Sequence, residues 1–139
     1  MKLFSLCGHA LLWATLTGAT PVSADEEHDM NRLASALTKL SSAVEATVKF
    51  KHPSPLLSSR ELLLLSTVHD TKLLTRFAPY EVLVYRNKDV VTLLVCERKR
   101  DRALLEDQAC TARMDQHHWR SSAMTMCAFT LMDYGQCAR

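Results

Sequence analysis

Cysteine is the side chain whose number and spacing most directly imply chemistry in this 139-residue chain. Cys96, Cys110, Cys127 and Cys137 lie in the C-terminal part, separated by 13, 16 and 9 residues, and Cys7 lies near the N-terminus. These gaps exclude the Cys-x-x-Cys pair that tunes a redox-active thiol. They also lack the paired short spacings of a structural zinc site. We therefore interpret the four C-terminal cysteines as structural disulfides.

Four cysteines allow three pairings. We expect the sequential one, Cys96 with Cys110 and Cys127 with Cys137. A charged turn between Cys96 and Cys110 could bring their Cα atoms to the roughly 5.5 Å that a disulfide requires. Each short loop would then stabilise the fold by roughly 2–3 kcal/mol through the unfolded state.

Histidine and methionine supply weaker candidates for metal binding. His117 and His118 are adjacent, so on a regular element they point apart, and exposed residues of a polar loop are the simpler interpretation. Met124 and Met126 precede Cys127, and thioether and thiolate ligands favour reduced copper. Methionine is more often a filler of gaps in the core. We expect no metal and no other cofactor, and keep a soft-metal or small-ligand carrier as the alternative function.

Hydrolytic motifs are missing from the sequence: it has no Gly-x-Ser-x-Gly elbow and no His-Glu-x-x-His. Glu106 and Asp107 are neighbours, but two glycosidase carboxyls must flank a bond at roughly 5–9 Å, so we expect a surface or capping role for this pair. A site assembled from distant residues, such as Asp115, His117 and a serine, would be invisible in one sequence. We predict that the protein is not an enzyme, with a cryptic hydrolase as the second alternative.

The N-terminus resembles a removable export signal in its layout. Lys2 precedes an apolar stretch from Leu3 to about Leu16, and Val22-Ser23-Ala24 has the small residues of a cleavage site. Residues 1–24 are thus predicted to be a signal peptide, and removing them from 139 residues leaves one small domain of 115, residues 25–139. Cys7 leaves with the signal, so the cysteine count becomes even. We expect a periplasmic or secreted protein.

The charge argues against a nucleic-acid partner, and the hydropathy argues against a membrane-spanning segment after the signal. Lys and Arg number 17 and Asp and Glu 15, so the net charge is +2, or +1 without Lys2, which gives no support for a nucleic-acid partner. After the signal, no apolar stretch reaches the roughly 18 residues of a membrane span. The expected partner is another envelope or secreted protein.

Two helices are predicted in the N-terminal half. Residues 26–50 carry one apolar stripe, interrupted by Ser41 and formed by Met30, Leu33, Leu37, Leu40, Val44 and Val48. Ser58 and Glu61 fit a capping box that opens a second helix over about 59–77, with a bend near His69–Thr71.

An antiparallel hairpin is predicted next, with strands 81–85 and 90–96 and a polar loop over 86–89. Both faces of this hairpin are apolar, so we expect the helices to cover one face and the C-terminal third the other. Residues 102–114 fit a short helix or a third strand, and residues 123–134 alternate as a strand would, with a helix as the alternative for so short a segment. Only Gly135 remains after signal removal, which favours few and loose hairpins.

The predicted fold is therefore α+β: two N-terminal helices packed on a small antiparallel hairpin sheet, with a disulfide-braced C-terminal segment. With no catalytic motif, protein–protein binding is the expected function, either as an immunity or inhibitor protein or as an envelope accessory protein. Phe77, Tyr80 and Tyr85 cluster near the junction of helix and hairpin and are the candidate interface residues. If buried, they would instead belong to the core.

Overall fold

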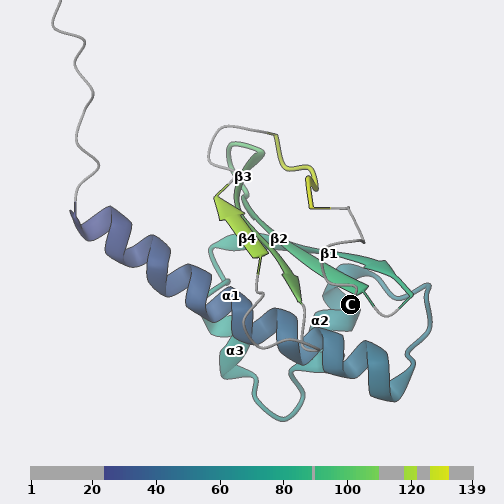
Figure 1. The fold of residues 1–139 in the computed structure, drawn as a ribbon. Coiled ribbons are helices and arrows are strands. Elements are labelled where there is room, and N and C mark those ends of the chain that lie inside the picture. Colours follow the sequence, from purple (N-terminus) through teal and green to yellow (C-terminus); the bar gives the residue numbers. More distant parts are fainter. Residues whose placement is uncertain (1–23, 89, 110–117, 122–125, 132–139) are drawn as a thin grey trace, which may run out of the picture.

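The structure is a computed structural model and describes residues 24–88, 90–109, 118–121 and 126–131. Within them lie helices α1 (Ala24–Lys51), α2 (Ser59–Ser66) and α3 (Lys72–Thr75) and strands β1 (Tyr80–Asn87), β2 (Val90–Glu97), β3 (Arg102–Ala109) and β4 (His118–Ser121). The strands form one antiparallel sheet in the order β1-β2-β3-β4. The helices lie on one face of the sheet and residues 126–131 on the other (Figure 1). The predicted α+β class is confirmed.

The α1 helix follows from its apolar spacing and its charged ends. Acidic residues occupy its first turn and basic residues its last turn, which complements the helix dipole. The helix stops where His52 adopts a positive φ of 46° and Pro53 follows, because proline cannot continue a helix. The apolar stripe is buried along its length, at Leu33, Leu37, Leu40, Val44 and Val48.

The predicted second helix is in fact two. Its capping box is confirmed: the Ser58 hydroxyl accepts from the Glu61 N–H, and the Ser58 N–H donates to the Glu61 carboxylate over 2.8 Å. The helix ends at Ser66 rather than bending, and the hydroxyls of Ser66 and Thr67 donate to the carbonyls of Leu62 and Leu63, one turn earlier. The chain becomes helical again at α3, where Asp70 Oδ1 accepts from the Lys72 N–H.

The hairpin of β1 and β2 is tighter than its glycine content predicts. Asn87 pairs with Val90, so the turn between β1 and β2 holds two residues instead of four. Lys88 adopts a positive φ of 53°, and Asp101, in the connection from β2 to β3, adopts 47°. The expectation of a loose hairpin was wrong for β1 and β2, where Lys88 takes the left-handed conformation that glycine usually supplies, whereas the connection from β2 to β3 holds four residues.

The segment after the hairpin is a strand over Arg102–Ala109, which decides between the two alternatives for the described part of residues 102–114. β3 pairs with β2 along its length, with a register shift between Val95 and Cys96, and β4 pairs with β3. β2 and β3 are therefore interior strands, and both of their faces are covered. Within the described part of the chain, no helix is long and apolar enough to cross a membrane.

Two apolar clusters hold the layers together. The larger joins the helices to the near face of the sheet, where α1 packs on Val91, Leu93, Val95 and Leu105. The smaller lies on the far face and joins Leu94, Cys96 and Ala103 to Leu83, Cys127 and Phe129. The C-terminal cover predicted for this face is thus confirmed, although residues 126–131 make only a bridge from Met126 to Arg102 instead of the predicted strand.

Candidate functional site

The disulfide joins Cys96 to Cys127, 31 residues apart, with a Cα–Cα distance of 5.7 Å. The sequential pairing of Cys96 with Cys110 was wrong, and the register of the sheet explains why. Cys110 follows Ala109, which pairs with Val91 at the opposite end of β2 from Cys96. The bond fastens the C-terminal cover to the far face of the sheet, and it is compatible with an oxidising compartment such as the periplasm or the extracellular space.

Two of the four metal-ligand candidates, His117 and Met124, lie outside the described residues, as do Cys110 and Cys137. The backbone of His118 pairs with Gln108 in the sheet. Met126 is 75% exposed, and the sulfur of Cys127 is taken by the disulfide, so it offers copper no thiolate. In the ranges that the structure covers, no group of three His, Cys, Asp or Glu side chains is placed to hold a metal ion.

The predicted pair Glu106 and Asp107 is buried, not on the surface, since both side chains are 0% exposed on interior strand β3. Successive side chains of a strand point to opposite faces, so the two carboxyl groups lie on opposite sides of the sheet. Asp107 faces α1, where the Ser41 hydroxyl donates to its Oδ2. They cannot flank one bond as a glycosidase pair does.

Glu106 organises the C-terminal cover. Its carboxyl group accepts from the Thr130 N–H over 2.8 Å, from the Thr130 hydroxyl, and from the Leu131 N–H over 2.7 Å. The Thr92 hydroxyl donates to the Leu131 carbonyl from the neighbouring strand. These contacts, with the disulfide at Cys127, hold both ends of the described cover, so the buried polar residues here have a structural role.

The aromatic interface candidates separate into two sites. Phe77 is 3% exposed and belongs to the core, while Tyr80 is half-buried, and both line a groove beside β1. Tyr85 lies on the far face, with its ring 5.7 Å from that of Phe129. Side-chain alternation along β1 explains the separation, because Tyr80 and Tyr85 differ by an odd number of positions.

The groove beside β1 has a volume of about 800 Å³. It lies between the edge of the sheet and the α2–α3 layer, and its apolar walls include Leu63, Leu64, Leu74, Phe77 and Val82. β1 is an edge strand, because it pairs with β2 alone among the strands that the structure describes. A groove that borders a sheet edge can offer backbone hydrogen bonds as well as apolar contact.

The edge of β1 is blocked at two points and open between them. The Val84 N–H donates to the Ser59 hydroxyl over 2.9 Å, and the Tyr80 carbonyl accepts from Arg98 Nε over 2.9 Å. In an antiparallel ladder, the backbone groups of every second residue point to the same side. The N–H and C=O of Val82 therefore point away from β2, as those of Tyr80 and Val84 do. Within the described chain, no hydrogen-bond partner is found for these two groups of Val82.

Charged side chains at the rim give the groove a small positive excess. Arg60 and Arg98 line it together with Glu81, and the ion pairs of the described residues involve neither arginine. Beside them, the hydrogen bonds from the Ser58 side chain and backbone hold the pKa of Glu61 below its ordinary value. Arg60 and Arg98 thus outnumber Glu81 among the lining residues, while the Glu61 carboxylate adds a negative charge next to Arg60.

No family model matches this chain, and neither curated protein sequences nor solved structures give a match.

Sequence reasoning identified Phe77 and Tyr80 but missed the feature that defines the groove, the open backbone at Val82. No local pattern marks it, because its exposure depends on which strand lies at the sheet edge. Ser41 was visible as an interruption of the apolar stripe, and that was a usable signal for a buried polar partner.

Proposed function

We propose that the protein is an exported binding protein whose groove receives an extended segment of another exported protein. The observation that carries the proposal is the pair of open backbone groups at Val82, set between two blocked positions of an edge strand. An incoming strand segment would pair with Val82 through two backbone hydrogen bonds, which is the mode of β-strand addition.

The walls of the groove define the chemistry of that segment. Leu63, Leu74 and Phe77 form an apolar floor that suits an aliphatic or aromatic side chain. Arg60 and Arg98 at the rim suit an acidic side chain or a C-terminal carboxylate beside it. Ser59 and Arg98 restrict strand pairing to a short stretch, so a short linear segment fits better than a long strand.

In this proposal the protein acts by occluding or supporting its partner, as an immunity protein, inhibitor or envelope accessory protein does. Export follows from the signal peptide predicted over residues 1–24, and an oxidising compartment suits the Cys96–Cys127 bond. The mass of the exported protein should then correspond to a chain that begins at Asp25.

The test compares two apolar residues of similar exposure, one that lines the groove and one that lies outside it. Leu64 is 55% exposed and lines the groove, whereas Val68 is 57% exposed and does not line it. A photoreactive amino acid at position 64 should crosslink a distinct envelope protein in cells, and one at position 68 should not. A synthetic peptide that spans the crosslinked segment should bind the oxidised protein, and Leu64→Glu should weaken that binding at least about tenfold while Val68→Glu leaves it unchanged.

Val82→Pro tests the backbone contact. Proline removes the outward N–H of Val82 without removing a hydrogen bond to β2, because edge positions tolerate proline. Binding of the same peptide should fall while thermal unfolding keeps one cooperative transition. Equal crosslinking at both positions, or peptide binding that survives both Leu64→Glu and Val82→Pro, would overturn the proposal, and a crosslink to a second copy of this chain would replace the partner with self-association.

A further inference from the structure

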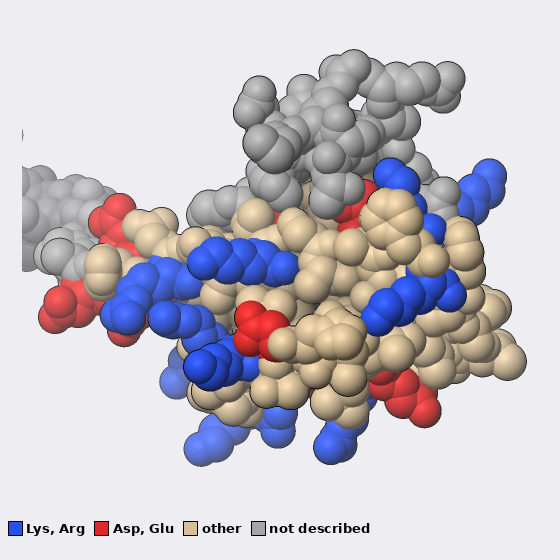
Figure 2. Space-filling view, turned by 90° about the horizontal axis from the view of Figure 1, so that it is seen from below, with Lys and Arg blue, Asp and Glu red and all other residues tan. Residues whose placement is uncertain are grey.

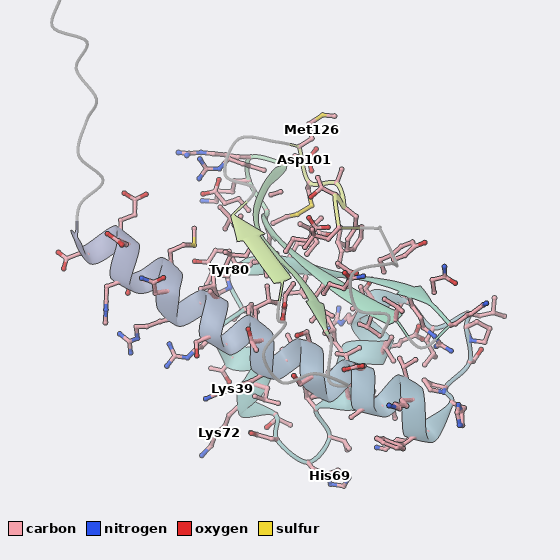
Figure 3. The ribbon with its side chains drawn as sticks, in the orientation of Figure 1. Lys39, His69, Lys72, Tyr80, Asp101 and Met126 are labelled. Atoms are coloured by element: carbon pink, nitrogen blue, oxygen red, sulfur yellow. A yellow bond between two sulfur atoms is a disulfide. The ribbon has the colours of Figure 1, made fainter. Side chains whose placement is uncertain are left out.

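Four cationic side chains surround a second hollow, between α1 and α3, with a volume of about 260 Å³. Arg32 and Lys39 come from α1, and Lys72 and Arg76 come from α3 and the residue after it. Figure 3 shows Lys39 and Lys72 on the same side of the molecule, below α1. Figure 2, seen from below, shows blue side chains gathered over the half of this face nearer the start of α1.

The helical spacing brings these charges together. Arg32 and Lys39 are seven residues apart and so share a face of α1, with Ser35 between them on the floor of the hollow. Lys72 opens α3 and Arg76 follows its last residue, so the two like charges lie one turn apart and repel each other. The fold therefore holds cations together at a cost that a bound anion would offset.

The protein itself supplies little counter-charge to the hollow. Within the described ranges, both ion pairs involve Glu97, so none of the four cations has a carboxylate within ion-pair distance. Asp70 is the acid among the lining residues, and its Oδ1 accepts from the backbone N–H of Lys72 over 3.2 Å. The charge is local, because the whole chain carries only +2.

We propose that this hollow binds an anion that carries two or more phosphate groups. Arginine matches phosphate oxygens through paired N–H donors, and lysine adds a mobile point charge. Cations on two helices suit a ligand with charge at more than one point, which a single carboxylate does not have. Such phosphates come either from a free oligophosphate or from the headgroups of a lipid surface.

The first arm of the test is calorimetric titration of the oxidised protein with inorganic tripolyphosphate. The double variant Lys39→Gln/Lys72→Gln should weaken binding at least about tenfold, since it removes one cation from each helix. The control Lys49→Gln/Lys51→Gln removes the same charge from the far end of α1 and should leave binding within about twofold. Amide signals of Ser35, Ala36 and Leu73 should shift on titration, because these residues line the hollow.

The second arm identifies the source of the phosphate. Vesicles of phosphatidylcholine mixed with phosphatidylglycerol are compared with vesicles of phosphatidylcholine alone, using the same variants. The site would be assigned to a lipid surface if the protein binds the anionic vesicles, if tripolyphosphate competes with this binding, and if Lys39→Gln/Lys72→Gln abolishes it. Tripolyphosphate binding without vesicle binding would assign it to a free oligophosphate. No tripolyphosphate binding by the wild type, or equal loss in both double variants, would overturn the proposal.

Discussion

The Ser41 hydroxyl on α1 donates a hydrogen bond to Asp107 Oδ2 on β3, across 66 residues of sequence. Both side chains are 0% exposed, so this polar contact is embedded in the interface of helix and sheet. An unsatisfied buried carboxyl group is costly, and this restricts α1 to the position at which Ser41 meets Asp107. The polar interruption of the apolar stripe thus sets how the long helix sits on the sheet.

A double-mutant cycle should show that Ser41 and Asp107 are energetically coupled. Ser41→Ala and Asp107→Ala should each lower the free energy of unfolding by at least about 1–3 kcal/mol, because each removes one side of a buried polar contact. The double variant should be more stable than the sum predicts, by at least about 0.5 kcal/mol in denaturant unfolding. The control is Ser42→Ala, which removes a hydrogen bond to the Thr38 carbonyl on the same helix. If the stability losses at Ser41 and Asp107 simply add, the coupling is contradicted.

Local patterns predicted α1, the capping box and the hairpin because each depends on residues close in sequence. The stripe of α1 repeats every turn, and Ser58 and Glu61 interact within one turn. The break of the second helix at Ser66 and Thr67 was not predicted, since a hydroxyl that bonds back to the previous turn is also tolerated within a helix.

Long-range pairing explains what the sequence did not reveal. Glu106 looked like a surface residue because its three donors lie 24 and 25 residues away in an irregular segment. The disulfide partner of Cys96 was misassigned because it depends on the register of β2 and β3 and on where the cover crosses them. The groove combines residues of α2, α3 and β1, whose arrangement is a property of the whole sheet.

Glu106→Gln should destabilise the C-terminal cover. The amide keeps one oxygen for the N–H groups of Thr130 and Leu131, but the Thr130 hydroxyl must turn to accept from the new N–H₂ group, and neutral hydrogen bonds replace stronger ones to a carboxylate. We expect a loss of about 2–3 kcal/mol in the free energy of unfolding. Glu81→Gln, at an exposed position of β1, should change stability by less than about 0.5 kcal/mol. A loss at Glu106 no larger than at Glu81 would contradict the anchoring role.

The Cys96–Cys127 bond should contribute strongly to stability, because it closes a 31-residue separation. The chain-entropy estimate for such a loop is about 3–4 kcal/mol, a large fraction of the stability of a small domain. Cys96→Ser/Cys127→Ser should therefore lower the melting temperature of the oxidised protein by many degrees. Reductant should lower the wild-type melting temperature toward that of this variant.

Peptide mapping under non-reducing conditions checks the pairing directly. A fragment that links Cys96 to Cys127 is expected, and one that links Cys96 to Cys110 would contradict the structure. Cys110→Ser/Cys137→Ser is the matched control, and its melting temperature measures what any bond between those two cysteines adds.

The capping box of α2 should respond to acid through Glu61. Its pKa in the folded protein lies below the ordinary value of 4.5, because the Ser58 side chain and backbone donate hydrogen bonds to the charged carboxylate. A lowered folded pKa means that the stabilisation is present above pH 4.5 and is lost as the pH falls through the folded pKa. The amide signal of Ser58 in NMR spectra should then titrate with a midpoint below 4.5.

Glu61→Gln tests whether the acid response of the capping box comes from the charge of Glu61 or from the geometry of its hydrogen bonds. Glutamine also completes a capping box at this position, but it does not titrate, so the Ser58 amide signal should become independent of pH in the acidic range. A Ser58 amide that titrates identically in both proteins would show that another group reports the acid response.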